Sequence, residues 1–267
     1  MTDLKDIRLF LMDLDGTIYH ENVLIDGAAL FFKLLQEQKK KYVFMTNNSS
    51  KNKSSYVKKL TSLGIDATED DIASSVNATI LYLKKSKPNA KIYLIGTESF
   101  KEELVSEGFE VVPIDYREAD VDFVVMGYDT ELTYAKLVGG CYYISRGYKY
   151  IATNCDWKCP LQDNKYVPDC GSFALMIEKA TNRLPKFLGK PERTLVDYVS
   201  EKTGIPIEQI ACVGDRLYTD IAVGINAGAT SICVLSGEAT EKDIEESNFK
   251  PDYIFPSIKE VYEALKK

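Results

Sequence analysis

The sequence predicts an α/β protein with a doubly wound, Rossmann-like parallel-sheet core and an inserted α/β domain. Short apolar runs alternate with amphipathic stretches along most of the chain, which is typical of strands and helices in βαβ units. Two aspartates, Asp13 and Asp15, directly follow the first apolar run. In open α/β sheets, ligands bind at the carboxyl ends of the strands. This segment therefore indicates both the fold class and the face of the sheet that carries the site.

The N-terminal part of the chain has the pattern of a βαβ unit. Residues 7–12 and 41–45 are apolar runs, so we expect two buried strands. Between them, residues 27–39 carry apolar side chains at helical spacing. A strand, a helix and a strand within roughly forty residues predict parallel pairing with a right-handed crossover. Residues 54–64 are expected to form another helix, which ends at a glycine.

The C-terminal part repeats this pattern and is expected to complete the same sheet. The strands are predicted at residues 209–213, 231–235 and 253–255, and the helices at residues 219–228 and 257–267. Together the two parts predict one discontinuous core domain, made of residues 1–78 and 181–267.

The middle of the chain, residues 79–180, is expected to fold as the inserted domain. Its strands are predicted at residues 91–95, 121–126 and 150–153, and its helices at residues 98–108, 133–146 and 171–180. About one hundred residues is an ordinary size for an independent domain.

Composition and charge exclude several classes of function. Of the 267 residues, 45% are apolar, which predicts a folded core rather than disorder. The net charge of −7 disfavours a nucleic-acid partner, because nucleic-acid-binding surfaces are usually basic. No apolar stretch reaches the roughly 18 residues that span a bilayer, so no membrane partner is expected. The N-terminus does not resemble a signal peptide, and we expect a cytoplasmic protein.

The cysteines and the single histidine limit the chemistry further. The six cysteines are expected to be reduced thiols. Cys155, Cys159 and Cys170 are close in sequence, but they lack the paired Cys-x2-Cys spacing of a zinc site. A Ser-His-Asp triad would need His20, the only histidine, and no Gly-x-Ser-x-Gly motif is present.

Asp13 and Asp15 offer the groups that phosphoryl transfer requires. A carboxylate can attack phosphorus and form an aspartyl-phosphate, and Asp13 ends the first strand. Side chains two apart on an extended chain share a face, so Asp15 can protonate the leaving oxygen and later deprotonate water. Gly16 permits the turn that follows, and Thr17 can fix it with a local hydrogen bond.

Other strand ends supply groups that could bind the phosphate. Thr46 follows the second strand and offers a hydroxyl, and Asn47 and Asn48 offer amides. Lys190 offers a positive charge that can shield both the nucleophile and the phosphate. We therefore expect Thr46, Asn47, Asn48 and Lys190 to bind substrate, and Lys190 to act in catalysis as well.

A divalent cation is expected beside these residues. Asp215 and Asp220 follow the predicted strand 209–213 and add two carboxylates. Magnesium prefers oxygen ligands and usually keeps several waters, so Asp13, Asp215 and the backbone carbonyl of Asp15 would suit it. The metal would also let an anionic phosphate approach an anionic nucleophile.

These segments, in this order, resemble the haloacid dehalogenase (HAD) superfamily of phosphatases. The matching residues are Asp13-x-Asp15-x-Thr17, Thr46-Asn47, Lys190 and Gly214-Asp215-x4-Asp220. The insertion between Thr46 and Lys190 is similar to the large α/β cap of the NagD and para-nitrophenylphosphatase branch. The motifs Thr153-Asn154-x-Asp156 and Gly189-Lys190-Pro191 also resemble that branch.

The resemblance implies a role for each matching residue. Asp13 would be the nucleophile and Asp15 the general acid/base. Magnesium would lie at Asp13, Asp15 and Asp215, with Asp220 as a further acidic group at the metal. A homodimer formed through the cap is consistent with the same resemblance.

The sequence thus predicts a magnesium-dependent phosphatase that hydrolyses small-molecule monoesters, of the sugar phosphate or nucleoside monophosphate type. A phosphotransferase or mutase on the same core, and a non-catalytic sensor of a phosphate ligand, remain open as alternatives. Single residues also have plainer interpretations. Thr46 or Asp220 could cap a helix, Asn154 and Asp156 could only shape a turn, and Arg216 could form a salt bridge.

Overall fold

The computed structural model describes residues 3–117, 120–161 and 165–266, and it divides into two compact units. The core unit contains the described residues up to 46, residues 53–73 and the described residues from 190 onward. The inserted unit contains residues 47–52 and the described residues of 74–189. The division of the chain at residues 79 and 180 into core and cap stays a prediction.

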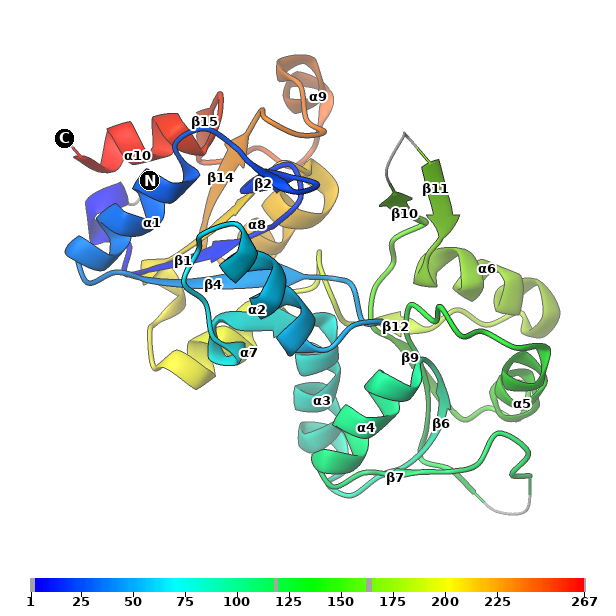
Figure 1. The fold of residues 1–267 in the computed structure, drawn as a ribbon. Coiled ribbons are helices and arrows are strands. Elements are labelled where there is room, and N and C mark those ends of the chain that lie inside the picture. Colours follow the sequence, from blue (N-terminus) through cyan, green and yellow to red (C-terminus); the bar gives the residue numbers. More distant parts are fainter. Residues whose placement is uncertain (1–2, 118–119, 162–164, 267) are drawn as a thin grey trace. The chain divides into compact units, whose positions relative to one another are not determined.

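The core unit is built on a six-stranded sheet with the order β15-β14-β13-β1-β4-β5 (Figure 1). Its strands are β1 (Leu9–Met12), β4 (Lys41–Thr46), β5 (Ile72–Ser74), β13 (Ile210–Gly214), β14 (Thr230–Val234) and β15 (Tyr253–Phe255). β1 pairs in parallel with both β4 and β13, so that Met12 lies opposite Phe44 and Val213. The carboxyl ends of these three strands therefore meet at one edge of the sheet.

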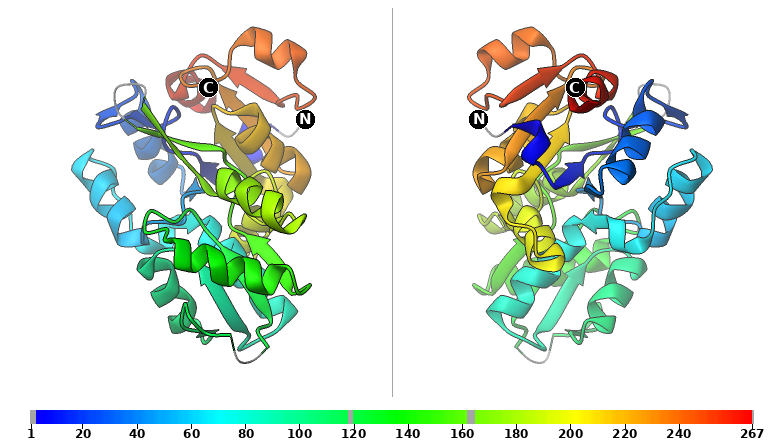
Figure 2. Two further views of the ribbon diagram at one scale, coloured as in Figure 1. Left: turned by 90° about the vertical axis from the view of Figure 1, so that its right-hand side faces the viewer. Right: turned by 90° about the vertical axis from the view of Figure 1, so that its left-hand side faces the viewer.

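Helices cover both faces of this sheet (Figure 2). On one face, Phe10 and Met12 pack with α1 (Ala28–Glu37) and α10 (Ile258–Lys266). Neighbouring side chains of the same strands point to the other face, where α8 (Ala222–Ala227) packs against β13 and β14. α7 (Thr194–Thr203) lies against α8. Each fully buried large apolar side chain contributes about 1.5–3 kcal/mol to this core.

The remaining elements complete the core unit. They are η1 (Leu4–Asp6), β2 (Tyr19–His20), β3 (Val23–Leu24), α2 (Lys53–Ser62), η2 (Glu69–Asp71), η3 (Ile207–Gln209) and α9 (Glu241–Glu246). The predicted helix 219–228 differs from the structure, in which a π-helical turn, η4 (Leu217–Ile221), precedes α8. The last residue of the predicted helix 257–267 lies outside the described residues.

The inserted unit has its own five-stranded sheet with the order β12-β9-β8-β6-β7. Its strands are β6 (Lys91–Ile95), β7 (Glu110–Val111), β8 (Phe123–Met126), β9 (Lys149–Ala152) and β12 (Lys186–Phe187), and all neighbours pair in parallel. α3 (Ser75–Ser86) and α4 (Glu98–Ser106) pack on one face. α5 (Tyr134–Ile144) and α6 (Cys170–Thr181) pack on the other. A hairpin, β10 (Lys158–Leu161) with β11 (Lys165–Pro168), stands apart from this sheet.

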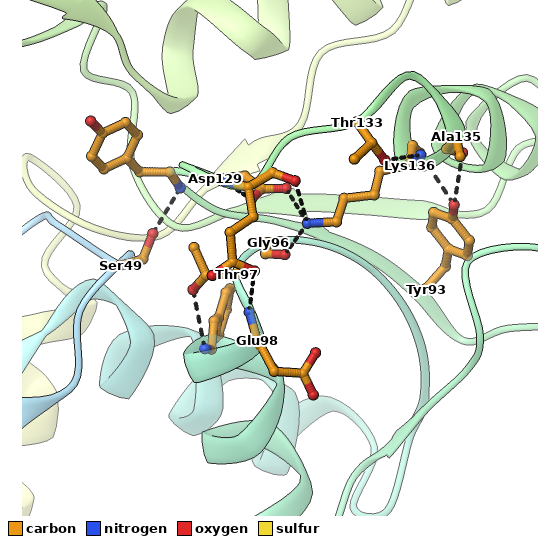
Figure 3. A network of polar contacts seen from close by, with 12 residues as sticks. Ser49, Tyr93, Gly96, Thr97, Glu98, Asp129, Thr133, Ala135 and Lys136 are labelled. Carbon is orange, nitrogen blue, oxygen red and sulfur yellow. Dashed lines mark hydrogen bonds and ion pairs between the residues drawn. The ribbon is translucent and has the colours of Figure 1, made fainter.

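A buried lysine joins the carboxyl ends of β6 and β8 to α5 in the inserted unit (Figure 3). The Lys136 Nζ donates to the carbonyl of Gly96 at 2.8 Å, to Asp129 Oδ2 at 2.9 Å and to the carbonyl of Glu131 at 3.1 Å. All three ammonium hydrogens can therefore be used within the protein. On the same sheet edge, the backbone N–H of Tyr128 donates to Ser49 Oγ, which fixes segment 47–52 to this unit.

The α/β class and the parallel, doubly wound core expected from the sequence are confirmed. Among the described residues, no helix combines the length and the apolar composition that crossing a bilayer requires.

Candidate active site

Three carboxylates meet at the carboxyl edge of the core sheet. Asp13 follows β1 and Asp215 follows the neighbouring strand β13, so parallel pairing places them side by side. Asp220 lies in η4, one π-helical turn further along the chain. Oxygen atoms of Asp13, Asp215 and Asp220 all lie within 4.8 Å of one another. Among the residues that the structure describes, this is the one such group of metal-ligating side chains.

Lys190 is the cation shared by two of these acids. Its Nζ lies 2.6 Å from Asp13 Oδ1 and 2.6 Å from Asp220 Oδ1, and its side chain is only 5% exposed. The other oxygen of Asp220 accepts the backbone N–H of Arg216 at 3.1 Å. Both oxygens of Asp220 are thus engaged, and the residue holds Lys190 beside Asp13.

Asp215 is held through different partners. Its Oδ1 accepts from Thr17 Oγ1 at 3.4 Å, and its Oδ2 accepts from the backbone N–H of Glu238 at 2.7 Å. Gly16 has a φ of +83°, and a Cβ built there would lie 2.6 Å from Asp215 Oδ2. Only glycine fits this position, because the turn needs a left-handed backbone and the carboxylate needs the space.

The electrostatics of the cluster favour an additional cation. Burial and the nearby charge of Asp220 raise the pKa of Asp13 to about 8. Burial and Asp220 also raise the pKa of Asp215 to about 6. Burial opposes the charge of Lys190, but Asp13 and Asp220 outweigh it and raise the pKa of this lysine. Three closely spaced carboxylates with one shared lysine are a donor set that fits a hard divalent cation.

Asp15 lies outside this cluster. Its side chain is exposed, whereas Asp13 is mostly buried. The turn after it is closed by hydrogen bonds from Gly16 N to the carbonyl of Tyr19 and from Ile18 N to the carbonyl of Leu14. Asp15 and Tyr19 form a backbone β-bridge, and burial and the charge of Asp15 raise the pKa of this tyrosine. The carboxylate of Asp15 is not among the three clustered acids, and a ligand role for its backbone carbonyl stays a prediction.

The predicted phosphate-binding residues are divided between the units. Thr46 is the last residue of β4, in the core unit with Lys190. Asn47 and Asn48 belong to the inserted unit. Asn47 Nδ2 donates to Asp156 Oδ2 at 2.9 Å, and Asn48 Oδ1 accepts from the N–H and the hydroxyl of Ser50. The binding of phosphate by these amides stays a prediction.

Asn154 and Asp156 form part of a polar network within the inserted unit. Asn154 is fully buried, and its Nδ2 donates to Asp156 Oδ2 at 2.9 Å and to Asp169 Oδ1 at 3.0 Å. With the bond from Asn47, Asp156 Oδ2 accepts from two amides. These contacts support the interpretation that the two residues shape the turn after β9. The six cysteines are thiols rather than disulfides. Among the described residues, none of them joins a metal-ligating group.

One part of the site was not predicted from the sequence. Residues 236–239 follow β14 and contact Asp215 through the backbone N–H of Glu238. The position of this segment at the end of a core strand is the signal that could have indicated it.

The chain is similar to known proteins over nearly its whole length. A haloacid dehalogenase-like hydrolase model matches residues 10–110, and a HAD-hydrolase-like model matches residues 187–261. The chain is 33% identical to an acid sugar phosphatase of Staphylococcus saprophyticus, over 99% of this chain and 100% of that protein.

Solved structures with the same fold are similar over the same length. A 4-nitrophenylphosphatase from Thermotoga maritima superimposes with a TM-score of 0.91 and 41% identity, covering 98% of both chains. NagD from E. coli K-12 superimposes with a TM-score of 0.86 and 30% identity, covering 95% of this chain and 98% of that one.

Proposed function

Because this chain belongs to the haloacid dehalogenase-like hydrolases, in the branch of NagD and the 4-nitrophenylphosphatases, we propose that it hydrolyses small-molecule phosphate monoesters through an aspartyl-phosphate. The observation that carries the proposal is the group of buried acids around Lys190 at the carboxyl edge of the core sheet. Asp13, Asp215 and Asp220 have oxygens within 4.8 Å of one another, and Lys190 lies 2.6 Å from two of these acids.

Asp13 is the proposed nucleophile. One of its carboxylate oxygens attacks phosphorus, the bond from phosphorus to the ester oxygen breaks, and the electron pair leaves with that oxygen. Asp15 gives its proton to the leaving oxygen and then takes one from water. The water oxygen attacks phosphorus, the bond to Asp13 breaks, and inorganic phosphate is released. The exposure of Asp15 suits a group that must meet both the leaving group and water.

Lys190 is the proposed charge partner of this reaction. Its ammonium can shield Asp13 from the incoming phosphate and can also contact a phosphate oxygen. Asp220 acts through Lys190 in this proposal, since Asp220 Oδ1 lies 2.6 Å from the lysine and Oδ2 accepts a backbone N–H. Thr46, at the end of the neighbouring strand β4, is the proposed hydroxyl donor to the phosphate.

Magnesium is the proposed cofactor. Asp13, Asp215 and the backbone carbonyl of Asp15 would hold it, with Asp220 beside them. When bound, it would neutralise charge on the phosphate oxygens and the nucleophile. The raised pKa values of Asp13 and Asp215 support this assignment, because burial and the neighbouring Asp220 make their ionised forms unfavourable, which a bound cation would offset.

Sugar phosphates are the proposed substrate class, with nucleoside monophosphates as the second candidate. The relative named acid sugar phosphatase, which matches over 99% of this chain, supports the first class. A phosphotransferase or mutase and a non-catalytic phosphate sensor are the alternatives that an experiment must separate.

The test is a phosphate-release screen over sugar phosphates, nucleoside monophosphates and simple alkyl phosphates, with magnesium and with a chelator. We expect turnover only with the metal, concentrated on sugar phosphates, and none with the Asp13→Asn variant. Release that survives chelation would contradict the metal. Transfer of phosphate to an added alcohol or sugar in place of water would identify a transferase, and binding without any turnover would identify a sensor.

A further inference from the structure

Residues 236–239, here called the clamp loop, lie shortly after β14 and hold Asp215 in place. The backbone N–H of Glu238 donates to Asp215 Oδ2 at 2.7 Å. The backbone N–H of Ala239 donates to the carbonyl of Asp215 at 2.9 Å. Ser236 Oγ donates to the carbonyl of Gly16 at 2.7 Å, which ties the loop to the turn that carries Asp13 and Asp15. The clamp loop thus contacts two of the segments that form the site.

Two glycine backbones form a narrow slot for the Asp215 side chain. A Cβ at Gly237 would lie 2.6 Å from Asp215 Cβ and even closer to its carboxylate, and a Cβ at Gly16 would lie 2.6 Å from Asp215 Oδ2. A carboxylate confined in this way has little freedom to rotate, so its orientation is set before any ligand binds. Such preorganisation lowers the cost of binding.

An ion pair connects the clamp loop to the segment between the two acids that follow β13. Arg216 Nε lies 3.2 Å from Glu238 Oε2. The backbone of the same arginine donates to Asp220 Oδ2 at 3.1 Å. Glu238 therefore contacts Asp215 through its backbone and Arg216 through its side chain. Both contacts connect the clamp loop to the segment that follows β13.

We propose that the clamp loop is a positioning device for a cation ligand: Gly237 and the N–H of Glu238 fix the orientation of Asp215, and the Arg216–Glu238 ion pair keeps the loop in place. The inference rests on the proposed function only in taking Asp215 as a ligand of the divalent cation. Glu238 is a positioning residue, because it acts through Asp215. Partners that orient a metal ligand typically change metal affinity by about 10–100-fold when they are lost.

The test is a calorimetric titration of Mg²⁺ into the metal-free full chain, without substrate. Gly237→Ala should weaken Mg²⁺ affinity about tenfold or more, because the new methyl group displaces the carboxylate. Glu238→Gln keeps the backbone and the shape of the side chain, and should weaken affinity about threefold, since only a partly exposed ion pair is lost. Arg216→Gln is not an equivalent variant, because it also removes a positive charge that favours the ionised forms of Asp13 and Asp215.

Glu246→Gln is the matched control. It removes one acid from the exposed Lys242–Glu246 pair on α9, the helix that follows the clamp loop. We expect wild-type affinity in this variant. Circular dichroism of each metal-free variant checks folding, and Glu238→Gln keeps the test open if Gly237→Ala does not fold.

The outcomes separate this inference from the proposed function. If the wild type binds Mg²⁺ and neither Gly237→Ala nor Glu238→Gln changes the affinity, the clamp is overturned while the metal site stands. Equal weakening by the Glu246→Gln control would also overturn it, because net charge alone would then explain the effect. A wild type that binds no Mg²⁺ would overturn the metal site and the clamp with it.

Discussion

At the residue scale, Asp13 is the position that tests the proposed chemistry most directly. Asp13→Asn is nearly isosteric but removes the attacking oxygen anion, so we expect turnover to fall about a thousandfold or more. The fold should persist, because the change removes a buried acid whose charge is unfavourable there. Phosphate release and thermal unfolding of the same preparation check both parts. Unchanged hydrolysis in this variant would exclude Asp13 as the nucleophile.

The role of Asp15 can be distinguished from that of Asp13 by comparing substrates with poor and good leaving groups. Asp15→Asn removes the proton donor and leaves the three-acid cluster intact. We therefore expect a large loss of kcat with an alkyl phosphate and a smaller loss with 4-nitrophenyl phosphate, whose leaving group needs little protonation. The measurement is kcat for the two substrates in both forms of the enzyme. An equal loss on both would argue against general acid catalysis by this residue.

The sequence indicated that Asp13, Asp215 and Lys190 would lie at one edge of the sheet, but not how their atoms would pair. Asp13 and Lys190 are 177 positions apart, yet strand ends and motif order place both in the candidate site. The sharing of Lys190 between Asp13 and Asp220 depends on side-chain directions that no spacing reveals. The contact of Glu238 with Asp215 uses a backbone N–H, which every residue except proline has, so its residue type gives no signal.

At the element scale, the buried ion pair between Lys136 and Asp129 connects α5 to the loop that follows β8, and its contribution to stability can be measured. Its side chains are 9% and 0% exposed. Lys136→Met would leave the Asp129 carboxylate buried without its cation, and we expect a loss of about 3–5 kcal/mol in the free energy of unfolding. Urea denaturation measures it. Lys101→Met, which breaks an exposed pair with Glu98, should change stability by less than about 0.5 kcal/mol.

A loss as small as that of the Lys101→Met control would mean that the Asp129 charge finds water or another partner. The double variant Lys136→Met/Asp129→Leu should recover part of the stability, because it leaves no unpaired charge.

Some elements matched the sequence pattern in full, whereas others depended on their neighbours or were missed. The strands β6 and β15 begin and end where the apolar runs predict. β7 and β12 have two residues each, and their pairing exists only because β6 and β9 lie beside them. The helix α3 was missed: it begins with a box of Ser74 and Asn77, which is a less familiar start than Ser-x-x-Glu.

The π-helical turn η4 is the deviation with a functional consequence. The pattern of residues 219–228 predicts an ordinary α-helix. In the structure, the backbone of Leu217–Ile221 is π-helical, with hydrogen bonds between residues five apart instead of four. In this conformation the Asp220 carboxylate accepts hydrogen bonds from the backbone N–H of Arg216 and from the ammonium group of Lys190. π-helical segments are often found at functional sites, where they redirect a side chain.

At the scale of the whole molecule, the raised pKa values of the clustered acids predict how the free energy of unfolding depends on pH. In the unfolded chain, Asp13 and Asp215 lose their protons near the ordinary pKa of 3.8. In the folded, metal-free protein they keep them up to about 6 for Asp215 and about 8 for Asp13. Between about pH 4 and pH 8 the folded state therefore binds more protons than the unfolded state, and its stability falls as pH rises.

Acids whose pKa is lowered on folding do not mask this effect. These acids are Asp26, Asp70, Asp122 and Asp243. They lose their stabilising contribution as pH falls through their folded pKa values, which lie below 3.8. Their influence is thus confined to more acidic solutions, and the decline between about pH 4 and pH 8 belongs to the acidic cluster.

A divalent cation should reverse the decline, since it competes with protons for the same oxygens. We expect the urea midpoint of the metal-free protein to be higher at about pH 5 than at about pH 8, and the increase caused by saturating Mg²⁺ to be larger at the higher pH. Asp13→Asn should flatten the pH dependence of the metal-free protein, because asparagine cannot titrate. A metal-free protein that becomes more stable from about pH 5 to about pH 8 would show that the cluster is already neutralised by groups of the chain itself, and magnesium would then have no electrostatic role in the fold.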